Sequence, residues 1–275
     1  MIELFLFYHG SETTRVAQSA GIQGIVVDCE SLDKYGRQKG YDTEINAYHP
    51  SDVARVRREA RDLLVICRVN GFPLGSMQPA DGPGVIEDTL AAVQAGADEI
   101  LLPMVRSLSQ VEQVLEVIAG RAKLSLMLET EWAVEHAEQL DQFPLRRVFV
   151  GLNDLMIERG SRHLFENLWN GTVSTIRNRI RAASFGFGGL TLPDRGHPIP
   201  CELLMSEMAR LGCDVTFLRR SFYRDLKSSA ASPRECVEAI QSAWDRLVNR
   251  SAVEIEADHQ KLWKMLEDQL YPSAS

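Results

Sequence analysis

The stretch that decides the fold is residues 123–160, KLSLMLETEWAVEHAEQLDQFPLRRVFVGLNDLMIERG. An apolar run at 124–128 ends in the acid Glu129. A second apolar run, at 148–150, is soon followed by a second acid, Asp154. A helical segment joins the two runs. Two buried-looking strands that each lead into a carboxylate, with one helix between them, indicate two βα units of a parallel sheet.

Parallel order places the carboxyl ends of both strands at the same edge of the sheet, and neighbouring strands lie about 5 Å apart. We therefore expect Glu129 and Asp154 to lie close together. Two close carboxylates repel each other unless a cation lies between them or one keeps its proton. Such oxygen ligands suit a hard divalent cation, Mg²⁺ above all, with Mn²⁺ or another divalent ion as the alternative. The alternative is that one acid caps the following helix and the other pairs with an arginine.

Similar apolar runs recur along the chain and alternate with stretches of helical periodicity. Strands are expected at 2–8, 24–28, 64–67, 99–102, 124–128, 148–150, 185–192 and 214–218. This alternation favours an α/β fold, a (β/α)8 TIM barrel over 1–250, with a doubly wound sheet as the alternative. An amphipathic pattern at 253–270 predicts an additional helix in a C-terminal extension, 251–275.

Local signals mark where several helices begin. Ser51 and Ser109 are expected to cap two of them, and Ser232 with Glu235 to form the capping box of a third. Residues 154–183 are expected to form one long helical region.

Composition argues against several classes of function. The net charge is −8 and no basic stripe occurs, so a nucleic acid is not an expected partner. No apolar run reaches about 18 residues and no basic leader opens the chain, so neither a membrane span nor a signal peptide is expected. The five cysteines are odd in number and form no CxxC motif, which favours buried thiols in a reducing compartment. We therefore expect a cytoplasmic protein.

Charged residues also follow other strand-like runs: Asp28 and Glu30 follow the second, and Arg68 the third. Burying a charged side chain costs free energy unless it pairs with an opposite charge or takes part in a functional site. A guanidinium can hold a carboxylate or a developing enolate at two points, and a metal on the opposite side would stabilise the same enolate. Arg68, Glu30 and Asp28 are therefore the predicted catalytic residues. The alternative is an ion-pair network that only holds the strands together.

Five motifs resemble the HpcH/HpaI aldolase and citrate lyase β-subunit superfamily. They are VDCE at 27–30, RVN at 68–70, AGADEILLPMV at 95–105, LMLETEWAV at 126–134 and VFVGLNDLMIERG at 148–160. The resemblance implies a (β/α)8 barrel in which Glu129 and Asp154 bind Mg²⁺ or a similar ion. It also implies that Arg68 binds the enolate, and that Asp28 and Glu30 lie near the metal or its waters.

The resemblance further implies a carbon–carbon lyase or aldolase whose substrate is a small anion, a 2-oxo acid or an acyl-CoA. Backbone at Gly151, Leu152 and Asn153 would contact the substrate carboxylate, and Gly151 allows a close approach. Pro103, which closes the fourth strand, joins this substrate-binding set. The alternative for Gly151 is a simple tight turn.

Two residues depart from the aldolase pattern. Ser31 stands where the 2-oxo acid aldolases of the superfamily carry a histidine base, and Asn153 lies in GLNDL where they have GPADL. Two other hypotheses therefore stay open: a thioester hydrolase or condensing enzyme on the same scaffold, and a non-catalytic barrel used as a binding module.

The C-terminal extension raises the question of assembly. Enzymes of the superfamily commonly exchange a C-terminal helix between subunits, which implies a homo-oligomer, a trimer or hexamer. Trp263 and Leu266 lie on one face of the expected helix and could pack on a second subunit. The alternative is a helix packed on its own barrel.

Overall fold

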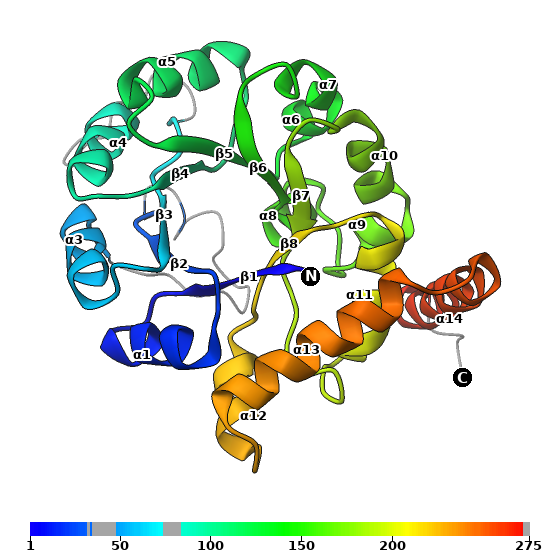
Figure 1. Cartoon of the computed structure of the whole chain (residues 1–275). Helices are drawn as coiled ribbons and strands as arrows, with labels where there is room; N and C mark the ends of the chain where they lie inside the picture. Colours follow the sequence, from blue (N-terminus) through cyan, green and yellow to red (C-terminus); the bar gives the residue numbers. More distant parts are fainter. Residues whose placement is uncertain (32–33, 35–47, 74–83, 272–275) are drawn as a thin grey trace.

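The barrel is closed and all-parallel, with its strands in sequence order (Figure 1). The computed structural model describes residues 1–31, 34, 48–73 and 84–271. The strands are β1 (Glu3–Phe7), β2 (Gly24–Asp28), β3 (Leu64–Arg68), β4 (Glu99–Leu102), β5 (Lys123–Leu128), β6 (Leu145–Val150), β7 (Ser184–Phe187) and β8 (Val215–Phe217). β1 also pairs with β8, which closes the ring. The predicted (β/α)8 TIM barrel is confirmed.

Helices surround the strands (Figure 1). They are α1 (Ser11–Ala20), α3 (Pro50–Glu59), α4 (Val85–Gln94), α5 (Leu108–Ile118), α6 (Glu131–Glu135), α7 (Ala137–Leu140), α8 (Leu152–Glu158), α9 (Glu166–Trp169), α10 (Thr172–Arg179), α11 (Cys201–Arg210), α12 (Ser221–Ser228), α13 (Pro233–Val248) and α14 (Ala252–Leu270). None of these helices has both the length and the apolar content to cross a membrane, a finding that covers the described residues.

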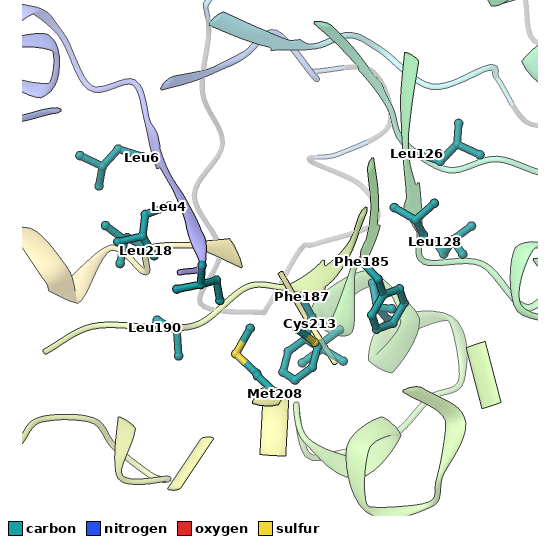
Figure 2. Close-up of a cluster of buried hydrophobic side chains, with 14 of the residues drawn as sticks. Leu4, Leu6, Leu126, Leu128, Phe185, Phe187, Leu190, Met208, Cys213 and Leu218 are labelled. Atoms are coloured by element: carbon teal, nitrogen blue, oxygen red, sulfur yellow. The ribbon is translucent and has the colours of Figure 1, made fainter. Parts of the chain in front are cut away.

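Alternation along each strand divides the core into two layers, because successive side chains of a strand point to opposite faces. The outer layer packs between strands and helices. Figure 2 shows part of it: Leu4, Leu6, Leu126, Leu128, Phe185 and Phe187 from the strands, with Met208 of α11. The inner layer fills the barrel and consists of Phe5, Val26, Ile66, Leu101, Met127, Phe149, Val215 and Phe217. These buried side chains fill the barrel, so its interior is a packed core and not a pore.

This alternation also determines which side chains face the mouth of the barrel. A residue two positions beyond an inner-layer residue points to the same side of the sheet. Asp28 follows Val26 at this spacing and Arg68 follows Ile66. Glu129 likewise lies two positions beyond Met127, an inner-layer residue. Three predicted site residues therefore face the barrel axis.

Two predicted helix caps are wrong. The helix predicted to begin at Ser51 begins at Pro50, with His49 as its N-cap, because proline suits the first helical position. Ser109 lies inside α5; the cap is Ser107, whose hydroxyl accepts a hydrogen bond from the Gln110 backbone N–H. The capping box of Ser232 and Glu235 is confirmed.

Two predicted elements are shorter than expected. The region 154–183 contains the separate helices α8, α9 and α10, since Gly160 and Gly171, with φ of 63° and 79°, interrupt it. Strand β7 ends at Phe187 and not at 192, because Gly189 has a φ of 130°, outside the extended region.

Helix α14 packs on α11 and α9 of its own chain, and it lies beside α11 in Figure 1. Leu262 and Leu266 are fully buried in this packing. His259 Nδ1 lies 2.9 Å from Oε2 of the buried Glu207 on α11. The isolated chain therefore holds its C-terminal helix against its own barrel.

Candidate functional site

Asp28 and Arg68 are neighbours in the register of β2 and β3, at the carboxyl ends of both strands. Arg68 Nε donates to Asp28 Oδ1 at 2.8 Å, and Arg68 Nη2 donates to Oδ2 at 2.7 Å. Arg68 Nε also lies 3.5 Å from Glu30 Oε2, and the guanidinium lies 5.4 Å from the centre of the Phe7 ring. The three residues predicted as catalytic are thus together, and Arg68 forms the ion pair that the alternative interpretation expected.

Lys34 is a member of this cluster that the sequence analysis missed. Its Nζ donates to Asp28 Oδ2 at 2.9 Å and lies 3.6 Å from Glu30 Oε2. Its side chain is only 3% exposed. Its spacing of four residues from Glu30, one helical turn, is the sequence signal that could have identified it.

The charges of the cluster stabilise one another. Burial by itself would raise the pKa of Asp28, but the charges and hydrogen bonds of Arg68 and Lys34 hold that pKa well below its usual value. Burial likewise acts to lower the pKa of Arg68, whereas Asp28, Glu30 and Glu129 raise it well above its usual value. Asp28 and Arg68 are therefore charged at neutral pH. Glu129 is close enough to Arg68 to contribute to its raised pKa.

Glu129 follows β5 and is 1% exposed. Its Oε1 accepts a hydrogen bond of 3.1 Å from the backbone N–H of Met104, a residue in the left-handed region with φ of 53°. Such a conformation is strained for a non-glycine residue, and here it belongs to a residue whose N–H contacts the carboxylate. On the other side, the carboxylate lies over Gly151, where a side chain would overlap it. The second predicted metal ligand is Asp154, in the first turn of α8, not at the strand end itself, and 6% exposed.

Glu129 and Asp154 offer carboxylate oxygens, which are the ligands that Mg²⁺ prefers. Both are buried oxygen donors, and Mg²⁺ commonly uses one or two carboxylates and completes its shell with water and substrate. Gly151 lacks the Cβ that would displace Glu129, so the carboxylate has room. Within the part of the chain that the structure describes, no group of three or more His, Cys, Asp or Glu side chains is arranged to hold a metal. A cation held by these two carboxylates would need further ligands from water or substrate.

The backbone of Ser31, at the position of the histidine in the aldolases, is fixed by a hydrogen bond. Its N–H donates to Asn70 Oδ1 at 2.8 Å, and Asn70 Nδ2 donates to Asp88 Oδ2 of α4 at 2.6 Å. Burial raises the pKa of Asp88. This chain of contacts connects the end of β3 to the backbone next to Glu30.

The other residues predicted to bind substrate differ in how deeply they are buried. Pro103 is buried beside Met104, and Asn153 is half-buried in α8. The Leu152 side chain packs in the outer core layer, so only its backbone can serve a ligand. Arg106, also at the mouth end, pairs with Glu158 of α8 at 2.5 Å.

Comparison with solved structures places this fold among known barrels. A citrate lyase from Burkholderia xenovorans matches with a TM-score of 0.62 at 15% identity, over 100% of this chain and 85% of that chain. This chain therefore shares its fold with aldolase and citrate lyase barrels. RipC from Yersinia pestis matches with a TM-score of 0.55 at 15% identity, over 93% of this chain and 98% of that chain. An HpcH/HpaI aldolase from Desulfitobacterium hafniense matches with a TM-score of 0.57 at 12% identity, over 87% and 93%.

A 3-hexulose-6-phosphate synthase from Salmonella typhimurium has the same fold, with a TM-score of 0.57 at 12% identity, over 90% of this chain and 100% of that chain. No protein-family model matches the sequence, and no curated protein matches it. At these identities the likeness shows the fold.

Proposed function

We propose that this chain is a divalent-metal-dependent carbon–carbon lyase of the aldolase or citrate lyase type. Its substrate would be a 2-oxo acid or an acyl-CoA, cleaved through an enolate. The observation that carries this proposal is the pair Asp28–Arg68, which presents a fixed guanidinium at the barrel mouth within electrostatic reach of Glu129. The resemblance of the motifs around these residues to the superfamily supports the same function.

Arg68 is suited to hold an anionic oxygen. Among the described residues, its hydrogen bonds use Nε and Nη2, which leaves the N–H groups of Nη1 as donors for a substrate. Its side chain is 12% exposed, so it is accessible from the mouth. Asp28 fixes the orientation of the guanidinium before a substrate arrives, which lowers the entropy lost on binding. Negative charge that develops on an enolate oxygen would be stabilised by this preorganised cation.

The acids on the other side of the mouth would hold the metal, with Glu129 and Asp154 as its protein ligands. A bound divalent cation would supply Lewis-acid polarisation of the substrate carbonyl. Backbone at Gly151, Leu152 and Asn153, with Pro103, would contact the substrate. Glu30, next to Asp28, would lie near the metal or its waters.

Calorimetric titration with Mg²⁺ and Mn²⁺ tests the metal site. Wild type is expected to bind, and Glu129→Ala and Asp154→Ala to lose binding while they keep the thermal unfolding transition of a folded barrel. Full metal affinity in either variant would contradict the proposal. A panel of 2-oxo acids and acyl-CoAs, assayed for release of pyruvate or acetyl-CoA, tests the reaction. Hydrolysis or condensation on the same panel would favour the enzyme types left open by Ser31, and metal binding without turnover would favour a binding module.

A further inference from the structure

Two loops at the mouth, those that follow β4 and β5, are joined through successive residues. Met104 donates its backbone N–H to Glu129 Oε1 at 3.1 Å. At the next position, the carbonyl oxygen of Val105 accepts a hydrogen bond from Thr130 Oγ1 at 2.6 Å. Glu129 and Thr130 are both buried. These contacts hold the β5 loop from the side of β4.

Glu158, the last residue of α8, extends this connection to a third element. Its Oε1 accepts from Arg106 Nη1 at 3.1 Å and from the backbone N–H of Glu131 at 2.9 Å. Its Oε2 accepts from Arg106 Nη2 at 2.5 Å, so the guanidinium is held at two points. The side chains of Arg106 and Glu158 are 29% and 20% exposed, so water screens this pair less than it screens a typical surface pair. Glu158 therefore joins both loops to α8.

Arg159 holds the same part of the β5 loop through a different contact. Its Nη2 donates to Glu131 Oε2 at 2.9 Å, and its Nε pairs with Glu131 Oε1. At the other end of α8, the backbone N–H of Gly151 donates to the carbonyl oxygen of Leu128 at 3.0 Å. Helix α8 is therefore held at both ends against residues 128–131.

These contacts bear on the two predicted metal ligands, because Glu129 belongs to the β5 loop and Asp154 to α8. The distance between the two carboxylates depends on how the loop packs against the helix. Glu158 lies four positions after Asp154, and residues four apart lie on the same face of a helix. The pair of Glu158 with Arg106 therefore acts on the face of α8 that carries Asp154.

We propose that Glu158 is a positioning residue that makes the metal site selective for Mg²⁺ over the larger Ca²⁺. It fixes α8 against the β5 loop, and with it the separation of Glu129 and Asp154. Mg²⁺ demands near-octahedral geometry with oxygen ligands at about 2.0–2.1 Å, whereas Ca²⁺ accepts flexible geometry at about 2.3–2.6 Å. Loosening the two ligands therefore costs Mg²⁺ more binding free energy than it costs Ca²⁺. This inference rests on the proposed function, in which Glu129 and Asp154 bind the metal.

Calorimetric titration with Mg²⁺ and, separately, with Ca²⁺ tests this role. Wild type is expected to bind Mg²⁺ more tightly than Ca²⁺. Glu158→Gln keeps the size of the side chain and an acceptor for the Glu131 N–H, but it removes the charged pair with Arg106. We expect this variant to bind Mg²⁺ at least about tenfold more weakly, as for other residues that orient metal ligands. Its Ca²⁺ affinity should fall by no more than about threefold, because Ca²⁺ tolerates displaced ligands.

Glu238→Gln is the matched control. Glu238 lies 3.6 Å from Arg234 of the same helix, α13, and the two side chains are 64% and 72% exposed. Because this pair lies within one helix and does not connect a loop to α8, neither affinity should change. A purely structural role of Glu158 would lower the affinities for Mg²⁺ and Ca²⁺ by the same factor, which leaves their ratio at the wild-type value.

The partner residue supplies an independent variant. Arg106→Gln removes the same pair from the other side and should lower the ratio of Mg²⁺ to Ca²⁺ affinity in the same direction. The double variant Arg106→Gln/Glu158→Gln should lie within about threefold of either single variant in Mg²⁺ affinity, because both changes act on one pair. Thermal unfolding shows whether each variant is folded. If Glu158→Gln does not fold, Arg106→Lys is compared with Arg106→Gln; it keeps the charge without the two-point contact and should retain more of the wild-type ratio.

The outcomes separate this inference from the proposed function. A wild-type protein that binds no divalent cation overturns both. A wild-type protein that prefers Mg²⁺, with Glu158→Gln equal to it in the ratio of the two affinities, overturns the role of Glu158 and leaves the proposed function standing. A wild-type protein that binds Mg²⁺ and Ca²⁺ equally well overturns the selectivity, and again leaves the proposed function standing.

Discussion

The backbone of Gly151 lies directly against the carboxylate of Glu129. A Cβ added at Gly151 would overlap Oε2 of Glu129 and lie 2.7 Å from its Cβ. Real side chains do not approach so closely, so Gly151→Ala must displace Glu129. We expect this variant to lose at least about tenfold in Mg²⁺ affinity, an effect comparable to moving one ligand. Gly188→Ala is the control, because its Cβ would meet Phe217 at an ordinary 3.7 Å. Unchanged metal binding in Gly151→Ala would remove Glu129 from the metal site.

Asp28 leads to a prediction about pH. A carboxylate whose pKa is lower in the folded than in the unfolded protein stabilises the fold above the unfolded pKa. That stability is lost as the pH falls through the folded pKa. Asp28 is such a group, since its folded pKa lies well below its usual value. Asp28→Asn should therefore lower the free energy of unfolding at pH 7, by about 3 kcal/mol for a broken buried pair. The difference from wild type should shrink as the pH falls below about 4, the unfolded value for aspartate.

Urea unfolding of both proteins at pH 7 and near pH 3 measures this difference. The exposed Asp268 supplies the control, and Asp268→Asn should unfold like wild type at both pH values. A deficit of Asp28→Asn that is equal at both pH values would contradict the assignment.

Arg147 anchors a second charged cluster, at the amino ends of the strands. It pairs with Glu99 of β4 and with Glu3 of β1, at 2.8 Å from the latter, and its side chain is 1% exposed. Burial raises the pKa of Glu99. Arg147→Met removes the ion-pair partner of the buried acid Glu99 and should lower the free energy of unfolding by about 3–5 kcal/mol. Because this cluster lies at the opposite end from the mouth, Mg²⁺ binding by the folded variant should not change.

The neighbouring Arg146 is the control for that experiment. Its side chain is 48% exposed and lies 3.6 Å from Glu3, so Arg146→Met should cost at most about 1 kcal/mol. Equal losses in the two variants, measured by chemical unfolding, would show that burial of Arg147 is not what makes its pairing important.

Assembly gives the last prediction. Large apolar side chains are exposed near the ends of α13 and α14: Val248 at 46%, Val253 at 79% and Tyr271 at 60%. Together with the resemblance to an oligomeric superfamily, this leads us to expect a homo-oligomer, a trimer or hexamer, which would cover such surface. Light scattering should give three or six times the chain mass of 30.8 kDa. The mass of a monomer at micromolar concentration would contradict this.

Elements with strong local signals could be predicted closely from the sequence. The bounds of β2 and β4 agree with the prediction, because each is a short apolar run between polar residues. Helix caps were less predictable: Ser51 and Ser109 have the right chemistry, but His49 and Ser107 have the right backbone geometry. Several nearby residues can cap a helix, and only the path of the chain into the helix selects one.

The sequence by itself determined the barrel and the row of charged residues at its mouth. Both follow from local patterns: alternation along strands, helical periodicity between them, and a charge directly after an apolar run. Only the tertiary structure decided which charges meet. Asp28 and Arg68 are 40 residues apart in the chain, and Lys34 lies in a stretch without periodicity. Their contacts depend on strand register and on the path of a connection, which arise when the barrel closes and not from any one segment.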